Sequence, residues 1–274
     1  MYGAIIGDIV GSVYERANIK HKDFELFKNE CRFTDDSVMT IAVADALLVH
    51  KLVDCELRDV LIKKLKYYGR LYPSAGYGGR FSSWLFSDSE KPYNSYGNGA
   101  AMRVSPCGLM ALSLSEAMKN AEISAAITHN HPQGIKGARA VAGAVFLASN
   151  NGSKADIKAF VEKFYKLDKC VDEIREAYTF DLSCQGTVPE AVTAFLESND
   201  FEDTIRTAIS LGGDSDTLAA IACSIAYPYY TRGYDSDEYK LRQALSIRDE
   251  AVSYLDRRLL KVICRFNSYV NNQY

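Results

Sequence analysis

The sequence predicts an all-α protein. Apolar residues recur at three- and four-residue spacing along most of the chain, and strand-like alternation is scarce. Short turns bearing Gly, Asn or Asp separate the periodic segments, and no low-complexity linker or solenoid repeat divides them. With 274 residues, 47% hydrophobic and 24% charged, the chain can bury a full core in one domain or at most two.

The helical periodicity defines a series of expected helices. In chain order they span residues 4–14, 37–49, 55–68, 116–127, 135–148, 155–166, 188–197, 203–211 and 217–227. The stretch 259–270 fits a helix or a strand, and we interpret it as a terminal helix.

Charge and cysteine usage exclude several classes of protein. The net charge is −3 and the 32 Lys and Arg are scattered, so we expect no surface that follows a nucleic-acid backbone. Seven cysteines, an odd number without a C-x-x-C pair, argue against both a disulfide framework and a structural zinc. Reduced thiols are typical of the cytoplasm.

The N-terminal segment 1–14 is apolar, but it lacks the basic start of a signal peptide and Asp8 interrupts it. No uncharged apolar stretch reaches the 18 residues that suggest a membrane span. We therefore expect a soluble, cytoplasmic protein that does not contact a membrane, and we expect it to be a monomer.

Two acidic motifs far apart in the chain have the same design, because each opens an apolar helical run. Side-chain oxygens in the first turn of a helix project from its end, so two such ends together would concentrate four carboxylates and two hydroxyls. The motifs are Thr34-Asp35-Asp36, before 37–49, and Asp214-Ser215-Asp216-Thr217, which leads into 217–227.

Helix capping is the commoner role for either motif alone, since Asp and Thr are favoured at N-caps and acids suit the helix dipole. One cap needs one side-chain oxygen, however, whereas each motif supplies two carboxylates and a hydroxyl. Carboxylates crowded without a counter-charge repel one another. The pair therefore favours a site for magnesium, manganese or calcium, and if the motifs share that site the chain is one domain.

Two Gly-rich turns, 74–80 and 93–103, lead into helical segments. Such turns let the backbone approach an anion, and a helix N-terminus presents free N–H groups, so a diphosphate would fit. Tight helix connections, which need no ligand, are the commoner role for either turn alone. His129 lies just before the helix expected at 135–148, where it is either a ligand-binding or a packed residue. The sequence has no G-x-S-x-G elbow, H-E-x-x-H or P-loop.

Taken together, these residues resemble the ADP-ribosylglycohydrolase family. The resemblance implies a compact, single-domain, all-α orthogonal bundle over residues 1–274 with a central binuclear metal cleft. The segments that carry it, in the family's order, are Gly3-Ala4-Ile5-Ile6-Gly7-Asp8-Ile9-Val10-Gly11-Ser12-Val13-Tyr14-Glu15, Phe33-Thr34-Asp35-Asp36-Ser37, Ser95-Tyr96-Gly97-Asn98-Gly99-Ala100-Ala101-Met102-Arg103, Thr128-His129 and Gly212-Gly213-Asp214-Ser215-Asp216-Thr217.

The resemblance also implies roles for single residues. Two Mg²⁺ or Mn²⁺ ions would be bound by Thr34, Asp35, Asp36, Asp214, Asp216 and Thr217. The diphosphate and the ribose would be held by Gly76, Tyr77, Gly78, Gly79, Ser95, Tyr96, Gly97, Asn98 and His129. Tyr77, Tyr93 and Tyr96 are the aromatic faces available for adenine.

The implied activity removes ADP-ribose from a modified protein side chain or small molecule. Glycosidic cleavage passes through an oxocarbenium-like state and needs a positioned water and a base. Glu15, which matches the acidic residue at the end of the family's first helix, is our first choice of base, with Asp35 and Asp36 as alternatives. The Glu15 pattern and the 95–98 loop favour an O-linked acceptor, and an arginine acceptor stays open.

Two other functions fit the same residues. A catalytically silent ADP-ribose-binding protein would keep the fold, although no implied metal ligand is missing from this chain. A metal-dependent nucleosidase or phosphoesterase would use the acidic centre but would not need a diphosphate-length site.

Overall fold

The computed structural model describes residues 1–53, 55–231 and 237–272, and within them it contains helices and no β-strand. The predicted all-α fold is therefore confirmed. The helices are α1 (Tyr2–Gly11), α2 (Asp35–Leu52), α3 (Leu57–Leu71), α4 (Gly79–Phe86), α5 (Gly99–Met102), α6 (Ser105–Met110), α7 (Leu114–Ala126), α8 (Pro132–Ser149), α9 (Lys154–Val161), α10 (Val171–Ala177), α11 (Cys184–Glu197), α12 (Phe201–Ile209), α13 (Ser215–Thr231), α14 (Glu238–Val252) and α15 (Arg257–Asn271).

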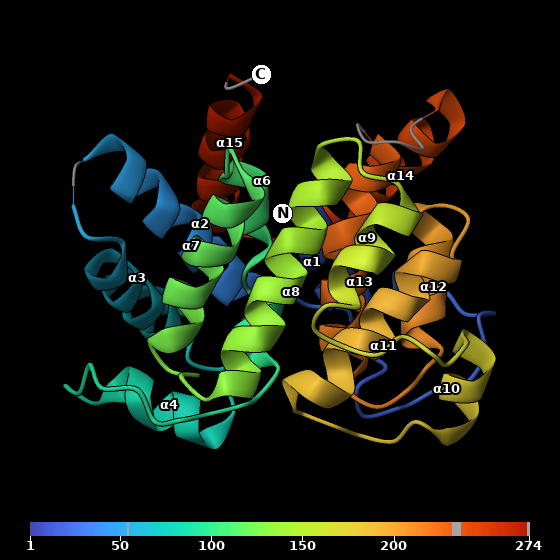
Figure 1. Ribbon diagram of the computed structural model, residues 1–274, viewed down its shortest axis with the longest axis horizontal. Helices are drawn as coiled ribbons and strands as arrows, with labels where there is room; N and C mark the ends of the chain where they lie inside the picture. Colours follow the sequence, from blue (N-terminus) through green and yellow to red (C-terminus); the bar gives the residue numbers. More distant parts are fainter. Residues whose placement is uncertain (54, 232–236, 273–274) are drawn as a thin grey trace.

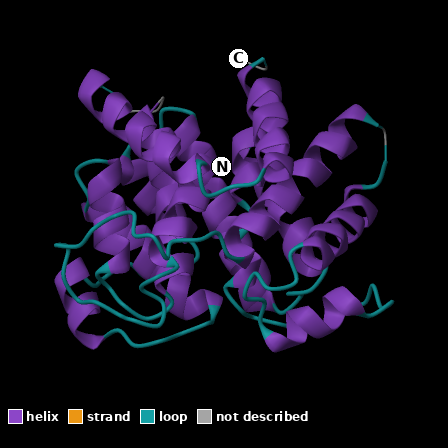
Figure 2. Ribbon diagram, turned by 180° about the vertical axis from the view of Figure 1, so that it is seen from behind, coloured by secondary structure: helices purple, strands orange, loops and turns teal. Residues whose placement is uncertain are grey.

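Helix α13 is the central element of the bundle. It is buried along almost its whole length and contacts α1, α8, α11 and α12. Figure 1 shows α2, α3 and α7 on one side of this centre and α10, α12 and α14 on the other. Many of the connecting loops gather at one end of the helices, the lower end in Figure 2.

Helices α1 and α13 approach so closely that only glycine fits between them. A Cβ on Gly3 would lie 1.9 Å from the carbonyl oxygen of Cys223, and one on Gly7 would lie 2.3 Å from that of Ala219. A Cβ on Gly11 would lie 2.5 Å from the Cα of Asp216. This four-residue glycine spacing fixes the end of α1 against the start of α13, where the second acidic motif lies.

The first helix is shorter than predicted. It ends at Gly11 rather than near residue 14, so Glu15 lies in the following turn and not at the helix end. The hydroxyl of Ser12 donates to the carbonyl of Ile9 at 2.8 Å, and the amide of Tyr14 donates to Gly11 in a tighter turn. Such local bonds compete with helical ones and stop the helix.

Other boundaries also differ from the prediction. Helix α9 ends at Val161 instead of 166, because the chain continues in tight turns, and α11 begins at Cys184, ahead of Pro189. Helices α6, α10 and α14 were not predicted, whereas α4 and α5 begin at the two Gly-rich turns. The terminal helix at 259–270 is confirmed as α15.

All seven cysteines lie in the described part of the chain, and all are free thiols. Within the same part, no helix is both long enough and apolar enough to cross a membrane.

Candidate active site

Three buried carboxylates from three helices meet at the centre of the molecule. One oxygen each from Asp8, Asp36 and Asp216 lies within 4.8 Å of the others. A second group, Glu15, Asp214 and Asp216, is equally tight and shares Asp216 with the first. The two acidic motifs, 178 residues apart in sequence by 214 − 36, are therefore neighbours in the structure. We call these five carboxylates the acidic cluster.

Asp8, which the sequence analysis did not assign to the site, holds the start of α2. Its carboxylate accepts hydrogen bonds from the amide and the hydroxyl of Thr34, at 2.9 and 2.6 Å. It also accepts from the amide of Ser37 at 3.0 Å and from the Ser37 hydroxyl. The hydroxyl of Thr34 in turn accepts from the amide of Asp36 at 3.4 Å, so Thr34 is the N-cap that the capping alternative proposed.

The oxygen atoms of the acidic cluster are incompletely satisfied. Oδ1 of Asp36 is buried and has no hydrogen-bond partner, while its Oδ2 accepts from the Thr217 hydroxyl at 3.2 Å. Asp214 accepts from the amide of Asn98 at 2.6 Å. Among the residues that the structure describes, no Lys or Arg forms an ion pair with the cluster.

Burial and like charge raise the pKa values of these acids. Burial raises the pKa of Asp36 and of Asp216 well above the ordinary value, and neighbouring carboxylates add to the rise. Burial, followed by Asp8 and Asp214, raises the pKa of Asp35 to about 8. Within the described residues these buried carboxylates have an unpartnered oxygen and no ion pair with a Lys or Arg. Such a group fits hard divalent cations, which prefer oxygen ligands.

Glu15 is partly buried at the edge of the cluster. Burial and then the charge of Asp214 raise its pKa, while the nearby Arg16 and Arg32 oppose the rise. Its carboxylate forms no hydrogen bond or ion pair within the described residues. Among the acids near the cluster, Glu15 is thus one that remains available to accept a proton from water.

The segment that follows Glu15 is fastened to the turn before α13. The side-chain amide of Asn18 donates to the carbonyls of Tyr14, Glu15 and Gly213, and its oxygen accepts from the Gly213 amide at 2.6 Å. Lys20 donates to the carbonyl of Leu211 at 2.6 Å. Asn18 therefore links Glu15 directly to the turn that carries Asp214.

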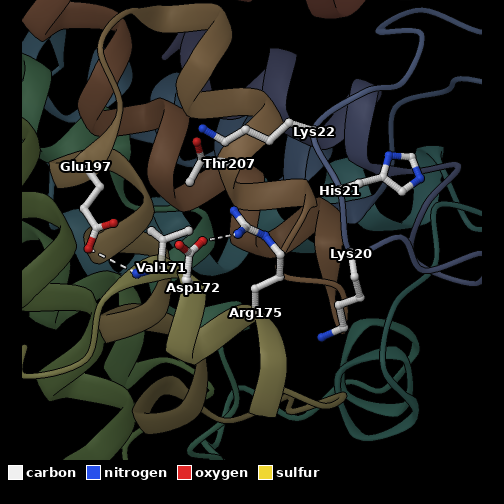
Figure 3. Close-up of a pocket in the computed structure, with 8 residues that line it drawn as sticks. All are labelled: Lys20, His21, Lys22, Val171, Asp172, Arg175, Glu197 and Thr207. Atoms are coloured by element: carbon white, nitrogen blue, oxygen red, sulfur yellow. Dashed lines mark hydrogen bonds and ion pairs between the residues drawn. The ribbon is translucent and has the colours of Figure 1, made fainter.

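The same segment also borders a second cavity, of about 340 Å³. Figure 3 shows Lys20, His21 and Lys22 there, beside Arg175 of α10 and Thr207 of α12. Lys22 forms an ion pair with Asp203 of α12 at 2.6 Å. These contacts hold the segment against the α10 and α12 side of the bundle.

A cavity of about 600 Å³ connects the acidic cluster to the Gly-rich loops. It runs from Glu15, Asp35 and Asp36 to the loops at 74–80 and 95–99. Phe180 and Leu182, which the sequence analysis did not single out, also line it and are half exposed.

The first loop is joined to the first acidic motif. The amide of Asp35 donates to the carbonyl of Ala75 at 2.8 Å, and Gly76 has a φ of +107°, which favours glycine. Gly78 and Gly79 leave open space, because a Cβ at either position would meet nothing within 4 Å. Both glycines line the cavity at the start of α4.

The second loop is joined to the second acidic motif. Asn98 donates to Asp214 at 2.6 Å and to the Thr187 hydroxyl at 3.1 Å, so it supports the loop, as expected for this residue. The hydroxyl of Ser95 accepts from the amide of Gly97 at 3.1 Å. Backbone bonds from Asn98 to Leu182 and from Cys184 to Tyr96 fix the loop beside α11.

His129 faces this loop with its Nε2 edge. Arg103, fully buried, donates to the hydroxyl of Thr128 at 3.0 Å, and that hydroxyl shares a hydrogen bond with Nδ1 of His129 at 2.7 Å. Burial, followed by Arg103 and Arg80, lowers the pKa of His129 well below its usual value, so the ring is neutral. The second ring nitrogen, Nε2, lies next to Gly97 and Gly99.

The three candidate aromatic residues are placed differently. Tyr93 lines the cavity, 5.9 Å from the His129 ring. Tyr96 is half exposed and packs edge-on against His131, and Tyr77 packs against Phe81 with its hydroxyl buried. Tyr77 and Tyr96, which were predicted to bind substrate, do not line the cavity.

Comparison with known proteins gives the family. A model of the family described as ADP-ribosylglycohydrolase matches residues 1–257 of the chain. The chain belongs to the ADP-ribosylglycohydrolase family. The resemblance drawn from the sequence motifs is therefore confirmed, and membership supports a hydrolase that acts on ADP-ribose linkages.

The similar proteins include ADP-ribosylhydrolase ARH3 of Danio rerio, 26% identical over 96% of this chain and 90% of the relative. The Mus musculus ARH3 is 27% identical over 83% and 82%. A solved structure titled "ADP-ribosylglycohydrolase-related protein complex" has a TM-score of 0.63 and covers 92% of both chains at 22% identity, which shows a shared fold.

Proposed function

We propose that this protein is a metal-dependent hydrolase that cleaves the glycosidic bond between ADP-ribose and a modified acceptor. The observation that carries the proposal is the cavity of about 600 Å³ that joins an unsatisfied acidic cluster to two open glycine loops. A catalytically silent binder would not need five carboxylates at the end of the cavity. A small-substrate nucleosidase would not need the loops.

In this proposal, two Mg²⁺ or Mn²⁺ ions are held by six residues of the two acidic motifs, Thr34, Asp35, Asp36, Asp214, Asp216 and Thr217. Cations bound there would orient the ribose hydroxyls and lower the pKa of water. Asp8 positions the ligands at the start of α2 through its four hydrogen bonds. Asn98 positions Asp214 through the hydrogen bond that it donates to it.

The remaining residues bind and orient the substrate. The backbone N–H groups at 76–79 and at Gly99 donate to the diphosphate, and His129 donates its Nε2 proton to a substrate oxygen. Phe180 and Leu182, with Tyr93, offer apolar area to adenine. Glu15 accepts the proton of the attacking water as the bond to the acceptor breaks. One domain over 1–274 carries all of these parts.

Hydrolysis assays with defined substrates test the proposal. The pure protein with Mg²⁺ is expected to release ADP-ribose from at least one of ADP-ribosylated serine, arginine or nucleotide substrates. Chelator treatment is expected to abolish release. Activity that survives complete removal of metal would contradict the metal-dependent mechanism.

Calorimetry separates this function from the smaller-substrate alternative. Free ADP-ribose is expected to bind far more tightly than ribose 5-phosphate, because only ADP-ribose reaches both loops and the apolar residues. A bulky replacement of Gly97, which faces His129, is expected to weaken ADP-ribose binding at unchanged metal content. Equal affinities for the two ligands would favour the nucleosidase or phosphoesterase.

A further inference from the structure

Two exposed arginines flank Glu15 at the rim of the cavity. Arg16 follows Glu15 directly, and Arg32 lies at the far end of the same connection, just before α2. Both side chains are exposed to solvent and both line the cavity beside the acidic cluster. Their positive charges reach Glu15, since both oppose the rise of its pKa.

The other cations of this cavity are already engaged. Arg80 donates to the carbonyl of Tyr93 and lies over its ring at 4.9 Å. Arg103 is buried and donates to Ser124 and Thr128. By contrast, the guanidinium groups of Arg16 and Arg32 form no hydrogen bond or ion pair with any residue that the structure describes. They are free to bind a ligand.

The two pairs of arginines act on different groups that line the cavity. Arg80 and Arg103 lie near His129 and the glycine loops, which would hold the diphosphate. Arg16 and Arg32 lie at the Glu15 end, where the glycosidic bond would be cleaved. Because Glu15 is the proposed base at that bond, a group that contacts Arg16 or Arg32 lies where the acceptor would leave.

We propose that the acceptor is a peptide side chain whose neighbours are anionic, carboxylate or phosphate, and that Arg16 and Arg32 bind those neighbours. This inference rests on the proposed function. Guanidinium groups pair with carboxylates and phosphates through two parallel hydrogen bonds, and both arginines lie at the open rim, where a peptide can continue into solvent. An acceptor rich in lysine or arginine would meet like charge.

A competing role for the two arginines is to balance the charge of the acidic cluster. In that case their loss would affect metal binding and all substrates alike. A preference that depends on the charge of the acceptor, by contrast, requires contact with the acceptor itself. The test therefore varies the charge of both partners.

Four synthetic peptides would each carry one ADP-ribosylserine flanked by Glu, by phosphoserine, by Gln or by Lys. The wild-type protein with Mg²⁺ is expected to favour the Glu and phosphoserine peptides over the Lys peptide by about tenfold or more in kcat/KM, the combined effect of two exposed ion pairs. The Glu and phosphoserine arms show which anion is preferred. Raising the salt concentration should compress the difference, because exposed charges are screened.

The double variant Arg16→Glu with Arg32→Glu is expected to invert the order and favour the Lys peptide. Replacement of both by Lys keeps the charge and should retain part of the preference. Arg265→Glu makes the same change of charge on the exposed face of α15 and should leave the order as in the wild type. Metal content, measured on each variant, controls for damage to the cluster.

Equal rates on all four peptides would overturn the inference and leave the proposed function standing. A uniform loss of activity on all four peptides in the double variant would also overturn the inference and leave the proposed function standing. Hydrolysis of none of the peptides by the wild type would remove both the inference and the hydrolysis of O-linked serine on which it rests.

Discussion

The start of α2 and the start of α13 carry similar acidic residues, but very different neighbours hold them in place. The start of α2 is held from inside by the buried carboxylate of Asp8, which accepts four hydrogen bonds from Thr34 and Ser37. The start of α13 is held from the rim by Asn18 and by the backbone of Gly212 and Gly213, with φ values of +72° and +70°.

The two acidic motifs of the site are therefore held in position by different kinds of contact. The α2 side depends on one buried charge and is expected to be rigid. The α13 side depends on a partly exposed amide that also holds Glu15, so the position of the proposed base and that of Asp214 are coupled. Substitutions on the two sides should therefore have distinguishable effects.

The largest effect is expected from Asp8→Ala. The variant leaves buried donors of Thr34 and Ser37 without their acceptor, which should lower the free energy of unfolding by about 3 kcal/mol. Part of that loss is offset, because the change also removes one like charge from the cluster. Urea unfolding measures the change, and a stability equal to that of the wild type would show that Asp8 does not hold α2.

The next effect is expected from Gly213→Ala. A Cβ there would lie 2.6 Å from the ring of Tyr178, and alanine disfavours the positive φ, so we expect a loss of about 2 kcal/mol. Gly78→Ala is the matched control, since its Cβ meets nothing within 4 Å. That control should keep its stability and lose affinity for ADP-ribose. Equal stability losses in both variants would contradict the account of the turn.

A smaller loss of stability is expected from Asn18→Ala, about 1 kcal/mol, because its partners are partly exposed. Its effect on kcat should be larger than its effect on stability, since Glu15 loses its link to the turn before α13. Lys22→Met, which removes the ion pair with Asp203 from the same segment, should cost a similar stability and leave kcat unchanged. If the two variants lowered kcat equally, the coupling through Asn18 would be disproved.

The last effect concerns pH in the metal-free protein. Burial and neighbouring acids raise the pKa of Asp35 to about 8, above the value of about 4 in an unfolded chain. Stability is then fully present below pH 4 and is lost as the pH rises toward 8, so the melting temperature should fall over that range. Bound metal should remove the trend. A melting temperature that rises from pH 5 to pH 8 without metal would contradict the assignment.

Much of the fold was predictable because it depends on local pattern. Leu259, Val262 and Phe266 repeat at helical spacing and form the buried face of α15. Helix α14 was missed because few of its residues are buried, chiefly Ala244, Ile247 and Ala251, so its apolar pattern is weak. Helix α6 is too short to show a period.

The candidate site was predictable only in part, for a physical reason. The two acidic motifs are visible in sequence because each lies at a helix start. Asp8 and Asn18 act through contacts between elements that lie far apart in the chain, and no local periodicity in the sequence indicates such contacts. The spacing of Gly3, Gly7 and Gly11 was a usable signal, because it predicts close approach by another helix.

The most direct test of the account is calorimetric titration of chelator-treated protein with Mg²⁺ or Mn²⁺. We predict two bound ions per chain for the wild type and at least one fewer for Asp36→Asn, whose unpartnered oxygen lies in the cluster. Asp45→Asn is the control, since Asp45 is also buried on α2 but pairs with Lys64 at 2.6 Å, and it should keep both ions. No binding to the wild type, or undiminished binding to Asp36→Asn, would contradict the central claim that this cluster is a metal centre.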